Sequence, residues 1–595
     1  MHLDACSIQE LFRNKSRLRR QLQNHSCREL RIAVLRGSTV NEVIELAELF
    51  LLAEGLRCTF YESEYNKYYE EAVIDSERIV NFRPDIVYVH TSCMNLRGWP
   101  PLSATESDHE AFVAAEFSRF QQIWDSVQQR LGSHIIQNNF ELPPFRVLGN
   151  LDSIAYGGRT RFINRLNLEF ANQAVHDPRL FVQDVHALSA ALGGRNWFDW
   201  ERWYNYKVMT TPAASLALAR SLTAIIRSLY GRSRKCLVLD LDNTLWGGVI
   251  GDDGPENIKI GRETAVAEAY TVFQEYCLML RSRGILLAVC SKNDEETAKQ
   301  GFEHPDSVLK LSDFSSFRAN WEPKHENLVA IAEELNLGVD SLVFVDDNPA
   351  ERALVASQLP MVAVPDVGSD VTQFIPALEA GGYFETVNTS AEDFSRADTY
   401  QANWQRALLE SKFRDYREYL DSLQMTADID AFKPVYLDRI TQLTNKTNQF
   451  NLTTRRYTAG DIQKISLDPT YITLYGKLTD AFGDNGLVSV IVGRKDGSTL
   501  HIELWLMSCR VLKRDLELAM LDELVARAQS ARIETIVGYY NRTPKNTMVA
   551  DHYLRLGFVC ESQDSNGAHS TWRLQVTADY QPRCRTIQVR DSVHT

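Results

Sequence analysis

The chain has 595 residues, a formal net charge of −14 at pH 7, and 44% hydrophobic against 24% charged residues. These values fit several folded domains of ~150 residues each and exclude a disordered chain or a general affinity for nucleic acid. Ten scattered cysteines without a Cys-x-x-Cys pair, and no apolar run of about 18 residues, predict a cytoplasmic protein with neither zinc, disulfides nor membrane contact.

Residues 1–230 predict an α/β domain that begins with a short amphipathic helix. Strands are expected at 31–35, 58–61 and 84–90 with helices between them, and a further helix over 211–230. Ser38 follows the first strand and Asn95 follows the third, which resembles the arrangement of nucleophile and oxyanion-hole residues in SGNH hydrolases.

The late Asp-x-x-His of that family is missing from this sequence. The matching region reads Asp199-Trp200-Glu201-Arg202, and the nearest histidine, His186 in Asp184-Val185-His186, has the wrong spacing. A serine without a base is a weak nucleophile. We therefore expect a catalytically degenerate SGNH-like domain in which Ser38 caps a helix. Ester hydrolysis by this domain stays open as a minor hypothesis.

The stretch 235–254 is the one around which the rest of the chain is organised. Its apolar run 236–239 predicts a buried parallel strand that delivers Asp240 and Asp242 into a Gly-rich turn. Open α/β sheets bind ligands at this carboxyl edge. Two acids so close together are costly there unless a divalent cation and a phosphate use them.

Three further polar motifs follow predicted strands or open predicted helices in the same region. Helices are expected at 265–283 and 324–335, and strands at 285–290 and 341–345. Together the motifs resemble the haloacid-dehalogenase (HAD) phosphatase superfamily, with the HAD-like domain spanning 231–385. The four motifs are Asp240–Thr244, Cys290–Asn293, Trp321–Lys324 and Val345–Pro349.

Phosphoryl chemistry explains why these residue types occur together. Mg²⁺ suits the site because it prefers a few carboxylates together with water and phosphate oxygens, and we expect Asp240, Asp346 and the backbone carbonyl of Asp242 to supply that coordination. Asp240 then attacks phosphorus, while Asp242 protonates the leaving oxygen and later activates water. Ser291 and Lys324 offer a hydroxyl and a positive charge to the phosphate. The alternative is that the acids are solvated loop residues or helix caps.

The amino-acid sequences of the motifs are more specific than the pattern shared by the superfamily, and they resemble the FkbH-like subfamily. The similarity covers the stretches Asp240–Gly254, Leu287–Asp294, Asn320–Lys324, Leu342–Pro349 and Leu443–Leu452. It implies an enzyme of polyketide or related biosynthesis that takes glyceryl from 1,3-bisphosphoglycerate, removes phosphate and loads glyceryl on a phosphopantetheinylated acyl carrier protein.

That implied reaction gives Cys290 a role as an acyl acceptor. Lys292 and the adjacent helix terminus are expected to lower its pKa, while a buried core cysteine is the equal alternative. The predicted site residues are Asp240, Asp242, Cys290 and Lys324 as catalytic groups; Thr244, Ser291, Lys292 and Lys324 as phosphate ligands; and Asp240, Asp242, Asp346 and Asp347 as metal ligands.

The C-terminal third begins with a helical connector at 386–424. Strands at 470–477, 487–493 and 499–506, a turn at 483–486, a helix at 516–529 and a strand at 535–540 resemble the GNAT acyltransferase order, within a domain at 425–579. Asn546 and the stretch Asp551–Phe558 belong to the same resemblance. Residues 580–595 are expected to form a mobile tail.

One departure from the GNAT pattern matters for function. The loop that would bind the coenzyme A pyrophosphate reads Arg510–Asp515 and has lost both glycines, so side chains should crowd a pyrophosphate. Lys513 and Arg514 either attract phosphopantetheine or an acidic carrier surface, or lie at a solvated helix start. We expect a docking or acyl-handling module.

The fold class predicted from sequence is thus α/β, a central HAD-like Rossmannoid parallel sheet flanked by an SGNH-like α/β domain and a GNAT-like α+β domain. The favoured function is glyceryl loading of a carrier protein. The alternatives are a HAD phosphatase of a small phosphorylated metabolite with non-catalytic flanking domains, and a carrier-binding scaffold with vestigial chemistry.

Overall fold

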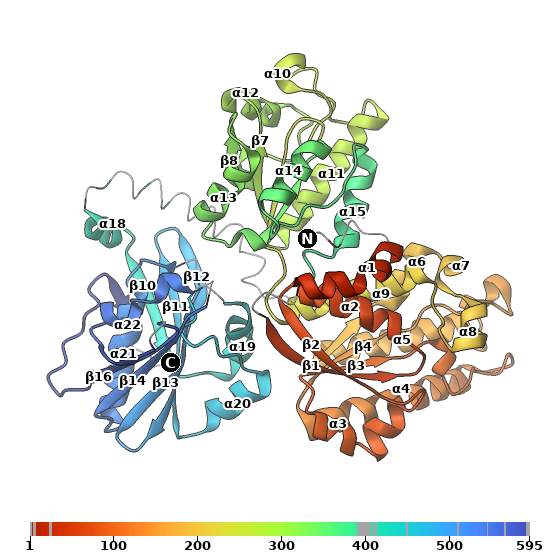
Figure 1. The fold of residues 1–595 in the computed structure, drawn as a ribbon, viewed down its shortest axis with the longest axis horizontal. Helices are drawn as coiled ribbons and strands as arrows, with labels where there is room; N and C mark the ends of the chain where they lie inside the picture. Colours follow the sequence, from red (N-terminus) through yellow and green to blue (C-terminus); the bar gives the residue numbers. More distant parts are fainter. Residues whose placement is uncertain are drawn as a thin grey trace. The chain divides into compact units, whose positions relative to one another are not determined.

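The computed structural model describes residues 3, 8–22, 27–388, 406, 409, 413, 415–447, 450–508, 511–543, 546–564 and 567–590. The chain divides into two compact units, coloured red to yellow and green to blue in Figure 1. The first unit comprises Met1–Ser228 and Ala380–Val387, and the second comprises Leu229–Glu379 and Asn388–Thr595.

The first unit is a three-layer α/β sandwich. Its five strands are parallel in the order β2-β1-β3-β4-β5, with α1, α2 and α9 on one side of the sheet and α3 and α4 on the other (Figure 1). Both faces of the strands are buried, as a parallel sheet covered by helices requires. The elements are α1 Ile8–Leu22, β1 Arg28–Arg36, α2 Asn41–Ala53, β2 Leu56–Glu62, α3 Glu77–Phe82, β3 Ile86–His90, α4 Glu106–Leu131, β4 His134–Asn138, α5 Arg159–His176, β5 Leu180–Gln183, α6 Val185–Leu192, α7 Gly194–Trp197, α8 Trp200–Tyr206 and α9 Pro212–Leu229.

The second unit begins with the predicted HAD-like domain. Four parallel strands have the order β8-β7-β6-β9, which places β6 in the middle of the sheet. Its elements are β6 Cys236–Leu239, α10 Ile250–Asp253, α11 Ala265–Ser282, β7 Leu286–Ser291, α12 Glu295–Gln300, β8 Phe314–Ala319, α13 Lys324–Glu334, β9 Leu342–Val345, α14 Pro349–Gln358 and α15 Phe374–Gly381.

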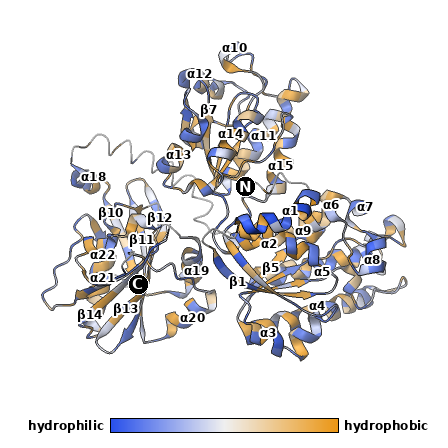
Figure 2. Ribbon diagram, viewed as in Figure 1, coloured by the Kyte–Doolittle hydropathy of each residue, from blue (hydrophilic) through white to orange (hydrophobic). Residues whose placement is uncertain are grey.

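The same unit continues into an eight-stranded, largely antiparallel sheet in the order β15-β16-β14-β13-β12-β11-β10-β17. In Figure 2 the strand β7 is coloured mainly hydrophobic, in keeping with its complete burial. The elements are α18 Tyr416–Ser422, β10 Met425–Asp430, α19 Leu437–Lys446, α20 Ala459–Leu467, β11 Tyr471–Asp480, β12 Gly483–Asp496, β13 Thr499–Met507, α21 Leu516–Ser530, β14 Thr535–Asn541, α22 His552–Arg555, β15 Val559–Gln563, β16 His569–Gln575 and β17 Ile587–Val589.

Two expectations for the C-terminal third were wrong. The predicted turn at 483–486 lies inside β12, because the chain turns earlier, at Ala481 and Phe482. The predicted mobile tail is partly structured: β17 pairs in parallel with β10, and the carboxylate of Asp522 accepts bonds from the main-chain nitrogens of Arg583 and Cys584. Residues 591–595 lie outside the described residues, as does most of the predicted connector at 386–424.

The predicted end of the HAD-like domain at residue 385 falls in a segment that packs with the first unit. The Arg227 guanidinium donates to the carbonyl of Gly382, and the main-chain nitrogen of Val387 donates to Ser228 Oγ over 3.2 Å. No helix in the described part of the chain is long and apolar enough to cross a membrane.

Candidate active site

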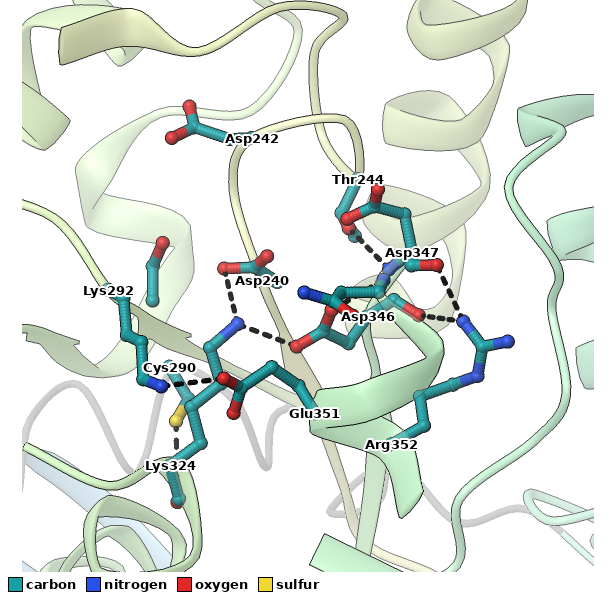
Figure 3. Close-up of polar contacts among 12 residues, drawn as sticks. Asp240, Asp242, Thr244, Cys290, Lys292, Lys324, Asp346, Asp347, Glu351 and Arg352 are labelled. Atoms are coloured by element: carbon teal, nitrogen blue, oxygen red, sulfur yellow. Dashed lines mark hydrogen bonds and ion pairs between the residues drawn. The ribbon is translucent and has the colours of Figure 1, made fainter. Parts of the chain in front are cut away.

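The polar motifs of the HAD-like domain meet at the carboxyl ends of three adjacent strands. Asp240 follows β6, Ser291 ends β7, and Asp346 and Asp347 follow β9. Lys324 is the first residue of α13 and points toward the aspartates (Figure 3). Because parallel strands end at one edge of the sheet, residues separated by about a hundred positions in sequence share one site.

Three carboxylates form the centre of this site. Oxygens of Asp240, Asp346 and Asp347 all lie within 4.8 Å of one another, and the first two side chains are buried. Lys324 Nζ is 2.6 Å from Asp346 Oδ2 and 3.1 Å from Asp240 Oδ1. One buried ammonium therefore faces three carboxylates, and a further cation at this place would relieve the repulsion among them.

Burial dominates the protonation equilibria of this centre. It raises the pKa of Asp240 well above the usual range, with Asp346 acting in the same direction and Lys324 opposing the rise. Burial likewise raises the pKa of Asp346 and of Asp347. For Lys324, burial lowers the pKa, but the two aspartates outweigh it and raise the pKa above the usual range.

The loop after β9 is held from behind by Arg352, a residue to which the sequence analysis gave no role. Its guanidinium donates to the carbonyl oxygens of Asp346 and Asp347, each over 2.7 Å, and pairs with Asp366 at 2.8 Å. Asp347 N also donates to Thr244 Oγ1 over 3.2 Å. The available signal was position: Arg352 lies in the first turn of the helix that the Asp-Asp-Asn-Pro motif opens.

The donor set of this centre fits Mg²⁺. Three carboxylates lie at strand ends around one ammonium, and the buried Asp240 Oδ1 has the Lys324 ion pair beside it but no hydrogen bond from the described residues, which leaves room for a cation with water and a phosphate oxygen. Asp240, Asp346 and Asp347 are the residues that would hold the cation.

The side chain of Asp242 does not join these carboxylates, contrary to the expectation that it is held near other acids. The metal contact expected of Asp242 is through its backbone carbonyl, and it stays a prediction. Its Oδ1 accepts hydrogen bonds from Trp246 Nε1 at 2.9 Å and Ile250 N at 3.0 Å, and its Oδ2 accepts one from Asn293 Nδ2 at 2.8 Å. Figure 3 shows it directed away from the cluster. A nonlocal set of N–H donors, which spacing cannot reveal, fixes this orientation.

The predicted phosphate ligands reach the site by different routes. Ser291 is buried beside Asp240, and its hydrogen bond lowers the pKa of that carboxyl, opposing the effect of burial. Thr244 is fully buried and accepts the bond from Asp347 N described above, so it supports the loop. Lys292 lies at the same edge, paired with Glu351 at 2.6 Å.

Cys290 is placed differently from what the acyl-acceptor hypothesis requires. Its side chain is fully buried in a core cluster with Leu328 and Ile331 of α13, and its Sγ contacts the carbonyl of Lys324 at 3.7 Å. The expected lowering of its pKa was wrong: burial raises it to about 12, more than the Lys324 ammonium lowers it. The thiol is thus held in its neutral, weakly nucleophilic form.

The SGNH-like edge of the first unit lacks the geometry of a hydrolase. Ser38 is buried, and α2 begins with Val40 as its capping position, so the expected helix-cap role was wrong as well. Asn95 Nδ2 donates to the carbonyl of Gly37 at 2.8 Å, and Asn95 Oδ1 accepts from Ser92 N at 2.9 Å. These bonds leave the amide no oxyanion-hole role.

In the C-terminal domain the parallel strands β13 and β14 separate beyond their paired residues, and a segment from earlier in the same domain fills the opening between them. The β13–β14 ladder ends after the pair Ile502 and Gly538. Beyond it, the segment Phe450–Leu452 lies between the strands, and its last residue donates to Trp505 O at 3.1 Å and accepts from Asn541 N at 2.8 Å. This segment is part of the motif that carried the family resemblance, of which residues 448 and 449 lie outside the described part.

The cationic helix start of this domain is also engaged internally. Arg514 is buried and pairs at 2.9 Å with Asp480, which pairs at 2.6 Å with Arg406 as well. The expectation that Arg514 is offered to phosphopantetheine or to a carrier was therefore wrong. Arg510 lies outside the described residues.

Comparisons with known proteins agree with this geometry. The family described as "FkbH, N-terminal domain" matches residues 46–224. The crystal structure of the N-terminal part of the protein BF1531 from Bacteroides fragilis, which contains a phosphatase domain and is complexed with Mg, is 30% identical with a TM-score of 0.58, and covers 63% of this chain and 99% of that chain. The search of curated protein sequences returned no match.

Similarity to acetyltransferases is much weaker. The ribosomal-protein-S18-alanine N-acetyltransferase from Escherichia coli is 10% identical with a TM-score of 0.21, and covers 27% of this chain and 100% of that chain. Ard1 from Thermoplasma volcanium is 19% identical with a TM-score of 0.20, and covers 26% and 99%. The acyltransferase resemblance of the C-terminal domain stays a prediction.

Fold and site together define a mixed α/β protein with a HAD-type phosphatase domain in its middle. Within that class, the N-terminal family match and the 30% identical relative show that the chain belongs to the FkbH family.

Proposed function

We propose that this protein is a Mg²⁺-dependent HAD-type enzyme that removes phosphate from 1,3-bisphosphoglycerate and loads the glyceryl group on an acyl carrier protein. The observation that supports the phosphoryl chemistry is the buried centre of Asp240, Asp346 and Asp347 facing Lys324. Glyceryl transfer rests on the family and on the wording of the motifs.

In the phosphoryl step, Asp240 attacks the phosphorus of the phosphate ester, its P–O bond to the glyceryl oxygen breaks, and an aspartyl-phosphate forms, while the acyl phosphate stays intact for the acyl step. The leaving oxygen takes a proton from Asp242, and the same carboxylate then takes a proton from the water that hydrolyses the intermediate. To do so, Asp242 must leave Trp246 and Asn293, which bind it in this structure.

Charge around the phosphoryl group comes from this chain and from the cation. When bound, Mg²⁺ neutralises part of the phosphate charge and so lets a carboxylate approach it. Lys324 holds a compensating charge between Asp240 and Asp346, and Ser291 donates its hydroxyl at the same edge. Arg352 keeps the β9 loop in register with β6.

In the acyl step, a phosphopantetheine thiol attacks the acyl carbon, the bond to the acyl-phosphate oxygen breaks, and phosphate leaves with the thiol proton. Cys290 as an intermediate acceptor stays a prediction. A glyceryl adduct on the protein that survives in Cys290→Ala excludes that role, and loss of the adduct with retained phosphate release supports it.

A second candidate function is hydrolysis of a small phosphorylated metabolite without transfer to a thiol. The burial of Cys290 and its raised pKa favour this alternative. It predicts phosphate release that is independent of any carrier.

The deciding experiment incubates the purified protein with 1,3-bisphosphoglycerate, Mg²⁺ and a panel of holo carrier proteins, and reads the products by intact mass. A carrier heavier by one glyceryl group supports the proposal. Phosphate release without a mass shift on any carrier supports the second candidate, and no Mg²⁺-dependent release at all contradicts both.

A further inference from the structure

An exposed surface of stacked aromatic rings and arginines occurs in the first unit, on the loop before α5 and on α8. We call it the aromatic patch, and we define it as Phe145, Arg159, Trp200 and Tyr204 with two arginines near them in sequence, Arg146 beside Phe145 and Arg195 on α7. Phe145 is 55% exposed, Trp200 36% and Tyr204 70%. None of these residues takes part in the phosphoryl site.

The rings of the patch contact one another in a row. The ring centroids of Phe145 and Trp200 are 6.4 Å apart, and those of Trp200 and Tyr204 are 6.1 Å apart with nearly parallel planes. The Arg159 guanidinium lies 5.3 Å from the Phe145 centroid and 4.9 Å from that of Trp99. Stacking holds the rings in fixed positions, so an incoming partner meets an ordered surface.

The apolar character of this surface extends along the loop before α5. Val147 is 56% exposed, Leu151 54% and Ile154 66%. Large apolar side chains exposed together along one segment are typical of an interaction site, because burying them against a partner removes their apolar surface from water. Aromatic and arginine side chains are also the ones most enriched at interface centres.

The charge of the patch is opposite to that of the whole chain. Residues 142–161 and 193–207 hold six Arg or Lys against three Asp or Glu, in a chain whose net charge is −14. Of the acids, Asp152 is buried and bonded to Thr160 N, Asp199 caps α8, and Glu201 is exposed; of the basic residues, Arg202 is paired with Glu42. Arg146 and Arg195 are exposed and form no ion pair within the described part of the chain.

We propose that the aromatic patch is the docking surface for the acidic face of the acyl carrier protein, an inference that rests on the proposed function. The charge selects an acidic partner, and the row of rings selects a folded protein with an apolar edge over a small anion. The surrounding charge of −14 opposes a nucleic acid, whose phosphates would be repelled by most of the surface.

The test uses two patch variants of the full chain and one control. Arg146→Glu combined with Arg195→Glu reverses the patch charge, and Tyr204→Ala removes the most exposed ring of the row. Arg78→Glu in α3 reverses an exposed arginine of the same unit that is outside the patch. Melting curves of all three verify that the variants fold.

The measured quantities are the KM for holo carrier protein, the kcat of loading and carrier-free phosphate release. The charge reversal is expected to raise the KM about tenfold, because charges at the rim of an interface mainly affect the rate of association. Tyr204→Ala is expected to raise it about threefold, because a ring that becomes buried on docking slows dissociation. The kcat and the phosphate release are expected to stay at the wild-type values. Raising the salt concentration should raise the KM of the wild type for the carrier protein and so narrow the difference in KM between the wild type and the charge-reversal variant.

Binding of fluorescent holo carrier protein, followed by anisotropy, separates failure of the docking surface from failure of the loading function. If the wild type binds but does not load, and the charge reversal weakens binding, the docking proposal holds and the loading function fails. Unchanged KM and unchanged binding in both variants overturn the docking proposal. Patch-dependent dimerisation, or patch-dependent binding of an oligonucleotide in place of the carrier, overturns it as well.

Discussion

The sheet of the first unit and the sheet of the HAD-like domain both collect polar residues at the carboxyl ends of parallel strands. In the first unit these side chains bond to the backbone: Asn138 accepts from Thr91 N at 2.7 Å, and Glu141 accepts from Cys93 N at 3.0 Å. In the HAD-like domain, three carboxylates instead face one another around a single lysine.

The difference shows which polar edge can perform chemistry. Polar groups whose hydrogen-bonding capacity is used within the protein build structure, and a ligand gains little from them. Carboxylates that the fold holds together against their mutual repulsion are not neutralised by the protein alone. They therefore favour the binding of a cation and a phosphate. Both edges are polar and lie at the carboxyl ends of parallel strands; among the described residues, three carboxylates are gathered in one place at the HAD-like edge.

Asp240→Asn should have the largest effect, since it removes the nucleophile of the charged edge. We expect phosphate release to fall at least about 10³-fold while the circular dichroism spectrum is retained. Asp306→Asn, at an exposed aspartate of the same domain, is the control and should leave turnover unchanged. Wild-type turnover in Asp240→Asn contradicts the assignment of this edge as the active site.

His90, the last residue of β3, tests the polar edge of the first unit through the pH dependence of the free energy of unfolding. Burial lowers the pKa of His90 from 6.5 to about 4, so between these values the unfolded state binds the proton that the folded state refuses. Stability of the first unit is therefore full above about pH 6.5 and falls toward pH 4, by at most about 3 kcal/mol from this group.

The measurement is hydrogen exchange of β1 and β3 between pH 4 and 7, corrected for the intrinsic exchange rate. His90→Phe should flatten the profile, and Tyr88 Oη keeps its bond to Gln183 at 2.7 Å. The matched variant is His176→Phe at an exposed histidine, which should leave the slope as it is. A slope that survives in His90→Phe assigns the acid sensitivity elsewhere.

Arg352→Lys sharpens the comparison at the charged edge without removing a carboxylate. Arg352 bonds the two carbonyls through Nη1 and Asp366 through Nη2, whereas lysine carries its donors on one nitrogen and cannot occupy both places, so the aspartates of the β9 loop lose their fixed position. We expect the Mg²⁺ concentration for half-maximal rate to rise about tenfold, with much of the rate recovered at saturating Mg²⁺. Arg318→Lys, at a half-exposed ion pair with Glu334, is the control, and an equal shift there would refute the role of Arg352.

Ser38→Ala should have the smallest effect on turnover. The hydroxyl is buried at the edge where polar groups are already satisfied, and removing it should change phosphate release and carrier loading by less than about twofold. The wild type is also assayed with simple esters, to test whether this domain hydrolyses them. Ester cleavage that disappears in Ser38→Ala would restore the hydrolase hypothesis.

Local sequence patterns predicted the elements around the site well. The apolar run 236–239 became β6 with the same bounds, and the helix expected at 265–283 became α11 over Ala265–Ser282. The N-terminal domain was predicted with three strands and has five, since the short β4 and β5 carry little alternation of their own. Parallel strands of four or five residues are recognised mainly through their neighbours.

Nonlocal contacts account for the errors. Asp242 is oriented by Trp246 and Asn293, and Cys290 is buried by α13, so the chemical state of each depends on elements from other parts of the chain. Strand β17 exists because β10, more than 150 residues earlier, offers it an edge. Spacing along the chain contains none of this information.

The sequence by itself determined the order of the domains and the group of acidic motifs that phosphoryl chemistry requires, because strand ends and helix starts are written in local patterns. Only the tertiary structure decided which acids share a centre, which thiol is buried and which polar edge is already satisfied. Those properties depend on distance, burial and hydrogen-bond partners, which packing alone establishes.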